Sequence, residues 1–292
     1  MSYEILVDSG SNLTADVLNK YNIKLISFRY REGDEEYICY EPSMDFAKVA
    51  HEYYDKMRAG VEFKTSLINS DQFENAMREI LSKGDDLIYL GISSGISGTV
   101  QASKIAADNL REEFPNRKIY IIDTLAASLG QGLQAVEASI LREQGLSVDE
   151  TYKQLTDRIM YMNQYFTVDD LKYLTRSGRL SSGEAFLGNL LSIKPILKGN
   201  DEGQIVLQQK VRSRKKSLDT LIDYCKEHVT DPADKIFAIA HCDVPEDVEY
   251  IIDRVQKEIG FRDVIKEYYD LCTGSHVGPG TIAIFFYGKR KE

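Results

Sequence analysis

The stretch "DDLIYLGISSGISGTV" (residues 85–100) joins a short apolar run to a loop rich in serine and glycine. The run at 86–92 has the length of a buried strand, and residues 97–114 place apolar side chains on one helical face. A strand followed by a helix is the repeating unit of parallel α/β sheets. The stretch therefore predicts a parallel sheet in the first part of the chain.

Similar apolar runs occur elsewhere in the N-terminal half. Each ends in small or polar residues, and most are followed by a helical pattern, which favours a parallel sheet with helices on both faces. The predicted strands cover residues 3–9, 24–30 and 118–124, and a further helix covers residues 125–144.

The pattern changes after about residue 160, where apolar runs are joined by short turns. We predict an α/β domain over 1–160, carrying the Thr65 and Ser93 loops. An α+β domain with a mainly antiparallel sheet follows over 161–292, carrying the "RSGR" segment and the His276 loop, with a ligand expected between the two domains. The strands predicted in the second domain are 164–170, a hairpin over 194–212 that turns at 200–203, 235–244, 264–270 and 281–288.

Charge and composition restrict the class of protein. The 292 residues include 36 Lys and Arg against 46 Asp and Glu, a net charge of -10, which is unusual for a general nucleic-acid binder. No signal peptide and no membrane-spanning run are evident, so at most transient membrane contact is expected. The four cysteines are widely spaced, which is typical of a reduced, cytoplasmic protein. No group of residues has the spacing of metal ligands, and no cofactor is expected.

The segment from Gly91 to Gly95 matches G-x-S-x-G, the nucleophile elbow of many hydrolases. In that interpretation Ser93 is a nucleophile and His276, in the glycine-rich "GSHVGPG", is its base. The same loop also fits an anion site, because glycines allow close approach and hydroxyl and N–H groups donate to negative charge. A third interpretation is a plain helix cap by Ser97 or Thr99.

Four segments resemble the DegV family, the FakB-type fatty-acid-binding subunits of bacterial fatty acid kinase. They are "FKTS" (63–66), "YLGISSGISGTVQAS" (89–103), "YFTVDDLKYLTRSGRLSSGEAFLGNLLSIKPIL" (165–197) and "HVGPGTIAIFFYG" (276–288). The resemblance covers nearly the whole chain and implies two α/β domains with a fatty acid buried between them.

The resemblance also implies a set of head-group residues. Thr65 and Ser93 match family residues that contact the acyl carboxylate, and His276 lies beside them. We expect N–H groups of the same loop to assist, at Ser94, Gly95, Ser97 and Gly98.

The chain departs from the family pattern at two places. Leu67-Ile68-Asn69 replaces the usual Gln-Pro-Ser, and Ser177 replaces the first glycine of a Gly-Gly-Arg element. The first change predicts that the loop covering the carboxylate differs from that of the family. The second leaves the backbone conformation near Arg179 open at this point.

The long apolar tail of a fatty acid determines what kind of binding site is needed. At about 0.8 kcal/mol per buried CH2, a tail of about 14 to 18 carbons dominates affinity, so an apolar tunnel is needed. Its predicted lining is Phe186, Leu187, Leu190 and Ile193.

The resemblance implies that a separate ATP-dependent kinase forms the acyl phosphate, and the lack of a P-loop pattern in this chain agrees with that expectation. Arg176 and Arg179 are the predicted docking residues for that kinase. The predicted function is therefore a non-catalytic carrier. A serine esterase using Ser93 and His276 is the alternative, and a self-sufficient small-molecule kinase is a weaker one.

Overall fold

The computed structural model describes residues 2–180 and 193–291, and the chain divides into two compact units. Unit 1 comprises residues 1–44 and 63–159, and unit 2 comprises residues 45–62 and 160–292. The sequence-based division at residue 160 assigned 45–62 to the first domain, whereas the structure packs this segment with unit 2.

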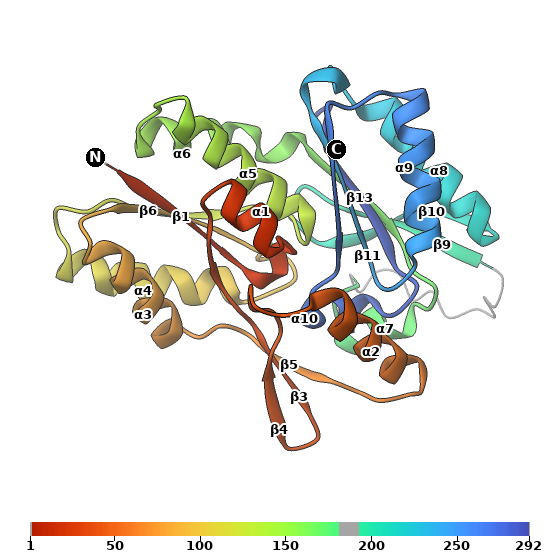
Figure 1. Ribbon diagram of the computed structural model, residues 1–292, viewed down its shortest axis with the longest axis horizontal. Helices are drawn as coiled ribbons and strands as arrows, with labels where there is room; N and C mark the ends of the chain where they lie inside the picture. The colour runs from red at the N-terminus through yellow and green to blue at the C-terminus, as the bar shows by residue number, and fades with distance from the viewer. Residues whose placement is uncertain (1, 181–192, 292) are drawn as a thin grey trace. The chain divides into compact units, whose positions relative to one another are not determined.

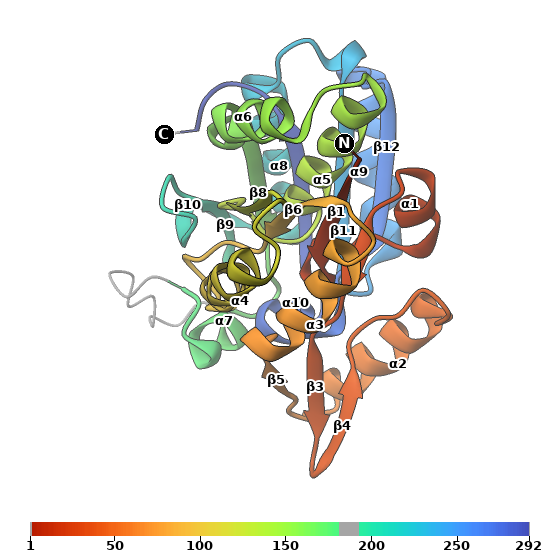
Figure 2. The same cartoon turned by 90° about the vertical axis from the view of Figure 1, so that its left-hand side faces the viewer.

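Unit 1 is built on a four-stranded, all-parallel sheet in the order β2-β1-β6-β7, as predicted. Every residue of β6 is buried, because helices α3 and α4 cover one face of the sheet and α5 and α6 cover the other (Figures 1 and 2). The elements are β1 (Tyr3–Asp8), η1 (Ser9–Ser11), α1 (Ala15–Lys20), β2 (Lys24–Ile26), α3 (Ser70–Leu81), β6 (Asp86–Gly91), α4 (Thr99–Glu113), β7 (Ile119–Asp123), α5 (Leu129–Glu143) and α6 (Val148–Arg158).

The single strand predicted over 24–30 was wrong. The chain leaves the parallel sheet after Ile26, and the N–H of Phe28 donates to the Ser9 hydroxyl at 3.1 Å. The chain then enters a small antiparallel sheet in the order β4-β3-β5, formed by β3 (Arg29–Glu32), β4 (Glu35–Ile38) and β5 (Lys64–Ser66).

Aromatic side chains hold this small sheet together. The Tyr30 ring stacks on Tyr37 with centroids 5.3 Å apart and meets the edge of Phe63 at 5.6 Å. Tyr30 also pairs with Thr65 of the neighbouring strand, so the sheet fixes the position of a predicted site residue.

Unit 2 contains a six-stranded sheet in the order β10-β9-β8-β13-β11-β12. All neighbours are antiparallel except β11 and β12, which confirms the predicted, mainly antiparallel sheet. The elements are α2 (Phe46–Arg58), η2 (Ile159–Tyr161), β8 (Met162–Thr167), α7 (Lys172–Ser177), β9 (Ile193–Gly199), β10 (Ile205–Arg212), α8 (Arg214–His228), η3 (Pro232–Asp234), β11 (Ile236–His241), α9 (Pro245–Glu258), β12 (Asp263–Tyr268), α10 (Leu271–Val277) and β13 (Ile282–Tyr287).

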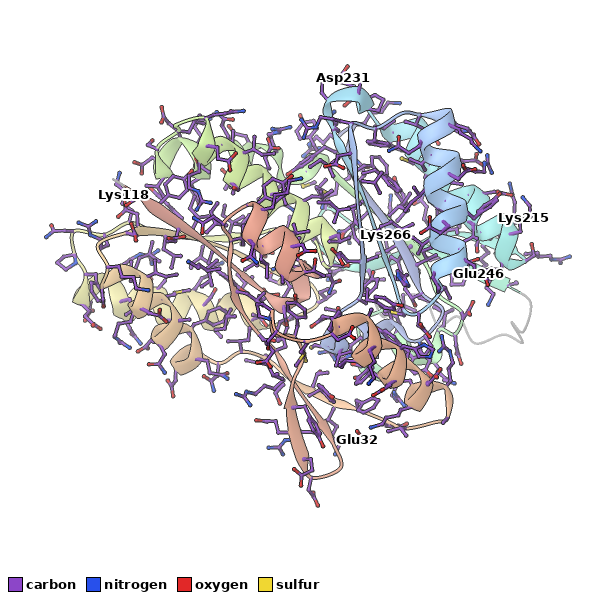
Figure 3. All side chains as sticks on the ribbon, in the orientation of Figure 1. Glu32, Lys118, Lys215, Asp231, Glu246 and Lys266 are labelled. Atoms are coloured by element: carbon purple, nitrogen blue, oxygen red, sulfur yellow. The ribbon has the colours of Figure 1, made fainter. Side chains whose placement is uncertain are left out.

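Helices α8 and α9 pack on this sheet and close its apolar core, in which Phe237, Ile239 and Phe286 are fully buried. The outward faces of the elements carry charge, as at Lys215 and Lys266 (Figure 3). In the described part of the chain, no helix is long and apolar enough to cross a membrane.

Helix α2 is anchored to unit 2 by its tyrosines and a charged pair. The hydroxyl groups of Tyr53 and Tyr54 donate to the carbonyl oxygens of Leu271 (3.0 Å) and Tyr269 (2.9 Å). Arg58 donates to Asp243 Oδ2 at 2.6 Å. These bonds explain why residues 45–62 belong with a unit from which they are distant in sequence.

Candidate functional site

Ser93 lies in the loop between β6 and α4 and is 1% exposed. Its hydroxyl oxygen accepts from the N–H of Gly95 at 3.1 Å, and its own N–H donates to the carbonyl of Ala126 at 2.8 Å. Its φ lies outside the positive region, and the helix begins only at Thr99. A nucleophile elbow places its serine in a strained turn directly before a helix, so this loop differs from that geometry.

Most N–H groups of the loop are already engaged. The Ser94 N–H donates to Asp123 Oδ1 at 3.1 Å, and the Ser97 N–H donates to the Ser93 carbonyl at 3.1 Å. Together with the Gly95 bond to Ser93, these contacts use three of the four N–H groups that the sequence assigned to an anion.

A buried carboxylate sets the start of the loop. Asp8 Oδ2 accepts from the Tyr89 hydroxyl (2.6 Å), the Gln131 side-chain amide (2.9 Å) and the Ile92 N–H (3.1 Å). Oδ1 accepts from the N–H of Gly10 at 3.0 Å. Burial raises the pKa of Asp8, and these four donors oppose the rise. Asp8 thus acts as a structural acceptor.

The neighbouring loop after β7 also supports Ser93. The hydroxyl of Thr124 donates to the Gly91 carbonyl at 2.8 Å, tying the two loops together. Leu125 and Ser128 adopt positive φ angles of 47° and 55°, which are unfavourable for side chains other than glycine. Such strain persists only where surrounding contacts fix the backbone, so the loop under Ser93 has a defined shape.

Thr65 lies in β5, half-buried, and the chain continues from it into the Leu67-Ile68-Asn69 departure. Leu67 Cδ2 lies 3.7 Å from the point that a Cβ on Gly98 would occupy, so the residues after Thr65 border the Ser93 loop. Asn69 begins α3 with a capping box, accepting from the N–H of Gln72 at 2.9 Å. Leu67 remains 51% exposed. The departure thus places an apolar side chain beside the loop.

His276 lies in the last turn of α10, in unit 2. Burial, followed by the positive charges of Arg179 and Arg176, lowers the pKa of His276 to about 4. The imidazole is therefore neutral at pH 7. Asp270 caps the N-terminus of α10, where its carboxylate accepts from the N–H of Thr273 at 2.8 Å.

Glycines allow close packing around the His276 helix. A Cβ on Gly274 would lie 2.0 Å from the Tyr54 hydroxyl oxygen, and one on Gly278 would lie 2.2 Å from a Tyr173 ring carbon. Helices α2 and α7 therefore approach α10 closely.

The "RSGR" segment ends α7. Gly178 occupies the C-cap with φ 69°, whereas Ser177 is the last helical residue. Only Gly178 needs the left-handed conformation, so the replacement of the family's first glycine by Ser177 does not disturb this turn. Arg176 pairs with Glu62, and its guanidinium lies 5.5 Å from the Tyr173 ring centroid. Arg179 donates to the Ser177 carbonyl.

The predicted tunnel residues are mostly beyond what the structure describes. Phe186, Leu187 and Leu190 lie outside the described residues, and Ile193 is a half-buried residue at the start of β9. The tunnel lining stays a prediction.

Three other side chains in unit 2 offer ligand atoms within 4.8 Å of one another, namely His51, Asp55 and Asp243. His51 Nδ1 is 3.0 Å from Asp243 Oδ2, and Arg58 also donates to that oxygen. Arg58 and His51 thus already contact the Asp243 carboxylate, and these contacts fit a cluster held together by hydrogen bonds and the Arg58–Asp243 ion pair.

The structure gathers the predicted residues into two groups. The Thr65 and Ser93 loops adjoin within unit 1. Within unit 2, the positive charges of Arg179 and Arg176 help to lower the pKa of His276. All four histidines of the chain belong to unit 2. Sequence reasoning missed Tyr89 and Gln131, whose contacts with Asp8 depend on the fold and have no local signature.

Comparison with known proteins identifies relatives along the entire chain. A family model described as an uncharacterised protein of the DegV family matches residues 2–289. A DegV domain-containing protein of Clostridium perfringens is 36% identical over 290 residues, covering 99% of both chains. A second, from Lactococcus lactis, is 33% identical over 293 residues and covers 100% of both.

Solved structures of DegV family proteins have the same fold over nearly the whole chain. A DegV family protein from Thermus thermophilus, described by its fatty acid binding, is 26% identical with a TM-score of 0.88, covering 99% of this chain and 100% of that one. DegV from Bacillus subtilis, described as a fatty acid binding protein, is 28% identical with a TM-score of 0.85 and the same coverage. Because both the family model and these relatives span the chain, it belongs to the DegV family.

Proposed function

We propose that this protein binds a long-chain fatty acid and presents its carboxylate to a separate ATP-dependent kinase, which forms the acyl phosphate. The observation that carries the proposal is membership of the DegV family, in which relatives at 26% and 28% identity are described as fatty acid binding. The adjoining Thr65 and Ser93 loops support the same assignment.

In this proposal the head group is held by the hydroxyl groups of Thr65 and Ser93 and by the N–H of Gly98. The Ser93 hydroxyl oxygen accepts from the N–H of Gly95, and this contact orients the hydroxyl group within the loop. His276 joins as a neutral donor, because its pKa is lowered to about 4. A neutral site avoids a buried, uncompensated charge once the anion has left.

The tail supplies most of the affinity. Burying about 14 methylenes contributes on the order of 10 kcal/mol before the cost of ordering the acid. The predicted lining by Phe186, Leu187, Leu190 and Ile193 is retained as part of this proposal.

The test begins with the acid itself. Organic extraction of the purified protein followed by mass spectrometry is expected to release an acyl chain of about 14 to 18 carbons. Retention of no lipid, together with no measurable affinity for palmitate, would refute the carrier proposal.

A matched pair of variants tests the head group. Ser93→Ala removes a proposed donor and is expected to weaken palmitate binding by about 1–3 kcal/mol, or roughly 5- to 150-fold. Ser94→Ala is the control, because it removes a hydroxyl group from an exposed position of the same loop and keeps the N–H that donates to Asp123. Equal affinities in the two variants would remove Ser93 from the site.

The serine esterase remains the alternative and has its own test. A fluorophosphonate probe labels a serine activated by a base. The ordinary backbone of Ser93, whose φ is not positive, favours no labelling. Covalent labelling at Ser93 that is lost in His276→Ala would establish the esterase instead.

A further inference from the structure

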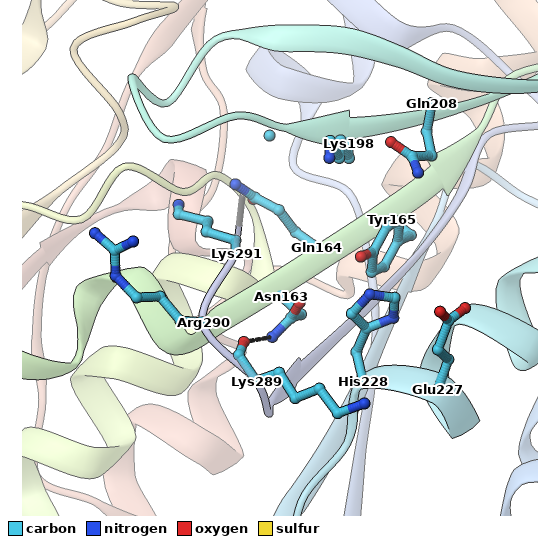
Figure 4. A pocket seen from close by; sticks show the side chains of 11 residues that line it. Asn163, Gln164, Tyr165, Lys198, Gln208, Glu227, His228, Lys289, Arg290 and Lys291 are labelled. Carbon is cyan, nitrogen blue, oxygen red and sulfur yellow. Dashed lines mark hydrogen bonds between the residues drawn. The ribbon is translucent and has the colours of Figure 1, made fainter.

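Unit 2 contains a polar cavity whose residues already interact within the protein. It has a volume of about 330 Å³ and is walled by β8, the β9–β10 hairpin, the end of α8 and the last residues of the chain (Figure 4). Lys198 and Lys291, two of its cationic residues, take part in contacts of the folded chain. Its lining is mostly polar and unsuited to an acyl chain, so we assign it no ligand.

The small sheet of unit 1 holds Thr65 in place through a neighbouring strand. β5 has three residues, and in the order β4-β3-β5 its partner among the described strands is β3 (Figures 1 and 2). A strand of this length depends on pairing, because even an isolated pair of strands is only marginally stable in water. Tyr30 is the residue of β3 that lies directly opposite Thr65. The position of Thr65 therefore depends on how firmly Tyr30 is fixed.

Aromatic contacts fix the ring of Tyr30. It stacks on Tyr37 with an interplanar angle of 23° and meets Phe63 edge-on at 85°. Stacked and edge-to-face pairs are the two favoured arrangements of aromatic rings. Tyr37 lies directly opposite Tyr30 on β4, so both tyrosines share one face of the sheet with Thr65. Tyr30 is 9% exposed, and its ring has little freedom to move.

The next row of the sheet carries charge on the opposite face. Arg31 lies opposite Glu36 on β4 and Lys64 on β5, and successive side chains of a strand alternate between faces. These three charged side chains therefore point away from the face that carries Thr65. Tyr30 itself is neutral at pH 7, because burial, followed by nearby acidic groups, raises its pKa to about 12. The side chain directly opposite Thr65 is thus an uncharged ring.

We propose that Tyr30 is a positioning residue, which fixes the side-chain rotamer of Thr65 for the head group of the fatty acid. The inference rests on the proposed function, in which the Thr65 hydroxyl contacts the acyl carboxylate. Directly opposite residues have Cβ atoms about 4.5–5.5 Å apart, which brings the Thr65 methyl group within reach of the Tyr30 ring. Because threonine is β-branched, a methyl group seated against the ring selects one χ1 rotamer and thereby the direction of the hydroxyl group.

A purely structural role for Tyr30 predicts a different pattern of affinities. Loss of a core side chain loosens the surrounding structure and weakens the binding of every ligand alike. A positioning role affects the one hydroxyl that donates to a carboxylate, and such charge-assisted hydrogen bonds are stronger than those to a neutral group. Palmitate and hexadecanol have tails of equal length and differ in the charge of the head group, so the ratio of their affinities separates the two roles.

The test measures both ligands on the full-length protein by displacement of a bound fluorescent fatty acid. Tyr30→Leu is expected to weaken palmitate binding by about tenfold and hexadecanol binding by less than about threefold. Tyr30→Phe keeps the ring and should retain palmitate affinity within about twofold. The control is Tyr37→Leu, which makes the same change one strand further from Thr65 and should weaken palmitate binding by less than about threefold.

A double-mutant cycle tests the rotamer itself. Thr65→Ser keeps the hydroxyl donor and removes the methyl group, so it should weaken palmitate binding by about fivefold in the unaltered protein and by less than about twofold in Tyr30→Leu. Circular dichroism and thermal unfolding verify the fold of each variant. If Tyr30→Leu does not fold, Tyr30→Met, which keeps more of the buried volume, takes its place with the same expected results.

Four outcomes would overturn the positioning role while the unaltered protein still binds palmitate. They are equal losses for palmitate and hexadecanol in Tyr30→Leu, the same loss in Tyr30→Phe, the same loss in Tyr37→Leu, and strict additivity of Tyr30→Leu with Thr65→Ser. In each of these cases the proposed function stands. No binding of palmitate by the unaltered protein refutes the proposed function and this inference with it.

Discussion

The Tyr89 hydroxyl donates to Asp8 Oδ2 at 2.6 Å, joining the two central strands of the parallel sheet at the end where the Ser93 loop begins. The same oxygen accepts from the N–H of Ile92, immediately before Ser93. A side chain that is fully buried in the core therefore acts on the position of a loop that carries the proposed head-group site.

Tyr89→Phe tests this link. The change removes one of four donors to a buried carboxylate, and we expect it to lower the free energy of unfolding by about 1–2 kcal/mol, measured by urea denaturation. Tyr161→Phe is the control, because Tyr161 is 41% exposed, and its effect should stay below about 0.5 kcal/mol. Equal stabilities of the two variants would show that the Tyr89 bond contributes nothing.

The contact between Gly274 and Tyr54 predicts a coupled pair. Ala is normally better than Gly inside a helix, yet Gly274→Ala places a methyl group 2.0 Å from the Tyr54 oxygen, and we expect a loss of about 1–3 kcal/mol. Tyr54→Phe removes that oxygen, so the double variant should lose less stability than the sum of the single variants. Strict additivity in urea denaturation would contradict the close contact.

Buried histidines predict a stability that falls in acid. Burial lowers the pKa of His241 from 6.5 to about 4, and its Nδ1 accepts from the N–H of Val244 at 3.2 Å. Between those pH values the unfolded chain binds the proton and the folded chain does not, so unfolding becomes easier as pH falls from 6.5 to about 4. His276 acts in the same direction.

The measurement is the free energy of unfolding in urea at several pH values. His241→Gln should reduce the slope by up to about 1.4 kcal/mol per pH unit within that window. His51 does not interfere, because its pKa is raised, chiefly by the hydrogen bond to Asp243, and its contribution is lost above pH 6.5. An unchanged slope in His241→Gln would show that His241 titrates normally in the folded protein.

The turn after α7 gives a prediction about glycine placement. Ser177 is helical and Gly178 has φ 69°, so Ser177→Gly should cost only about 0.5 kcal/mol, whereas Gly178→Ala should cost about 1 kcal/mol or more. Thermal unfolding distinguishes them. A stabilising Ser177→Gly would mean that this position also needs a glycine conformation.

The proposed kinase contact has a separate readout. Arg179→Ala is expected to leave palmitate affinity unchanged and to lower the rate of acyl-phosphate formation by an added fatty acid kinase. Arg262→Ala, which removes an exposed arginine elsewhere in unit 2, is the control for a nonspecific loss of charge. Loss of lipid binding in Arg179→Ala would contradict the separation of the two roles.

The sequence predicts those parts of the fold that depend on local apolar pattern. Both sheets were anticipated because their strands are apolar runs such as 86–92. The small sheet of β3, β4 and β5 was not, since Arg29–Glu32 and Glu35–Ile38 are rich in charge and owe their strand form to pairing with neighbours.

The position of the Ser93 loop was predictable, whereas the hydrogen bonds within it were not. The glycine and serine pattern located the Ser93 loop correctly between a strand and a helix. It assigned the N–H groups of Ser94, Gly95 and Ser97 to a ligand, whereas internal acceptors use them. The acceptor for Ser94 is Asp123, a residue from the next strand, so only the folded arrangement reveals it.

Residues 45–62 belong to unit 2 although unit 1 precedes and follows them in the sequence, and this determines how either unit can be expressed separately. The backbone leaves unit 1 after Met44, returns at Phe63, and leaves again after Ile159, so three peptide connections link the units. A gene fragment starting at residue 160 would encode a sheet without the tyrosines that hold Tyr269 and Leu271. An autonomous second half would have to be expressed as a fusion of 45–62 to 160–292, and one encoded without that graft should be insoluble.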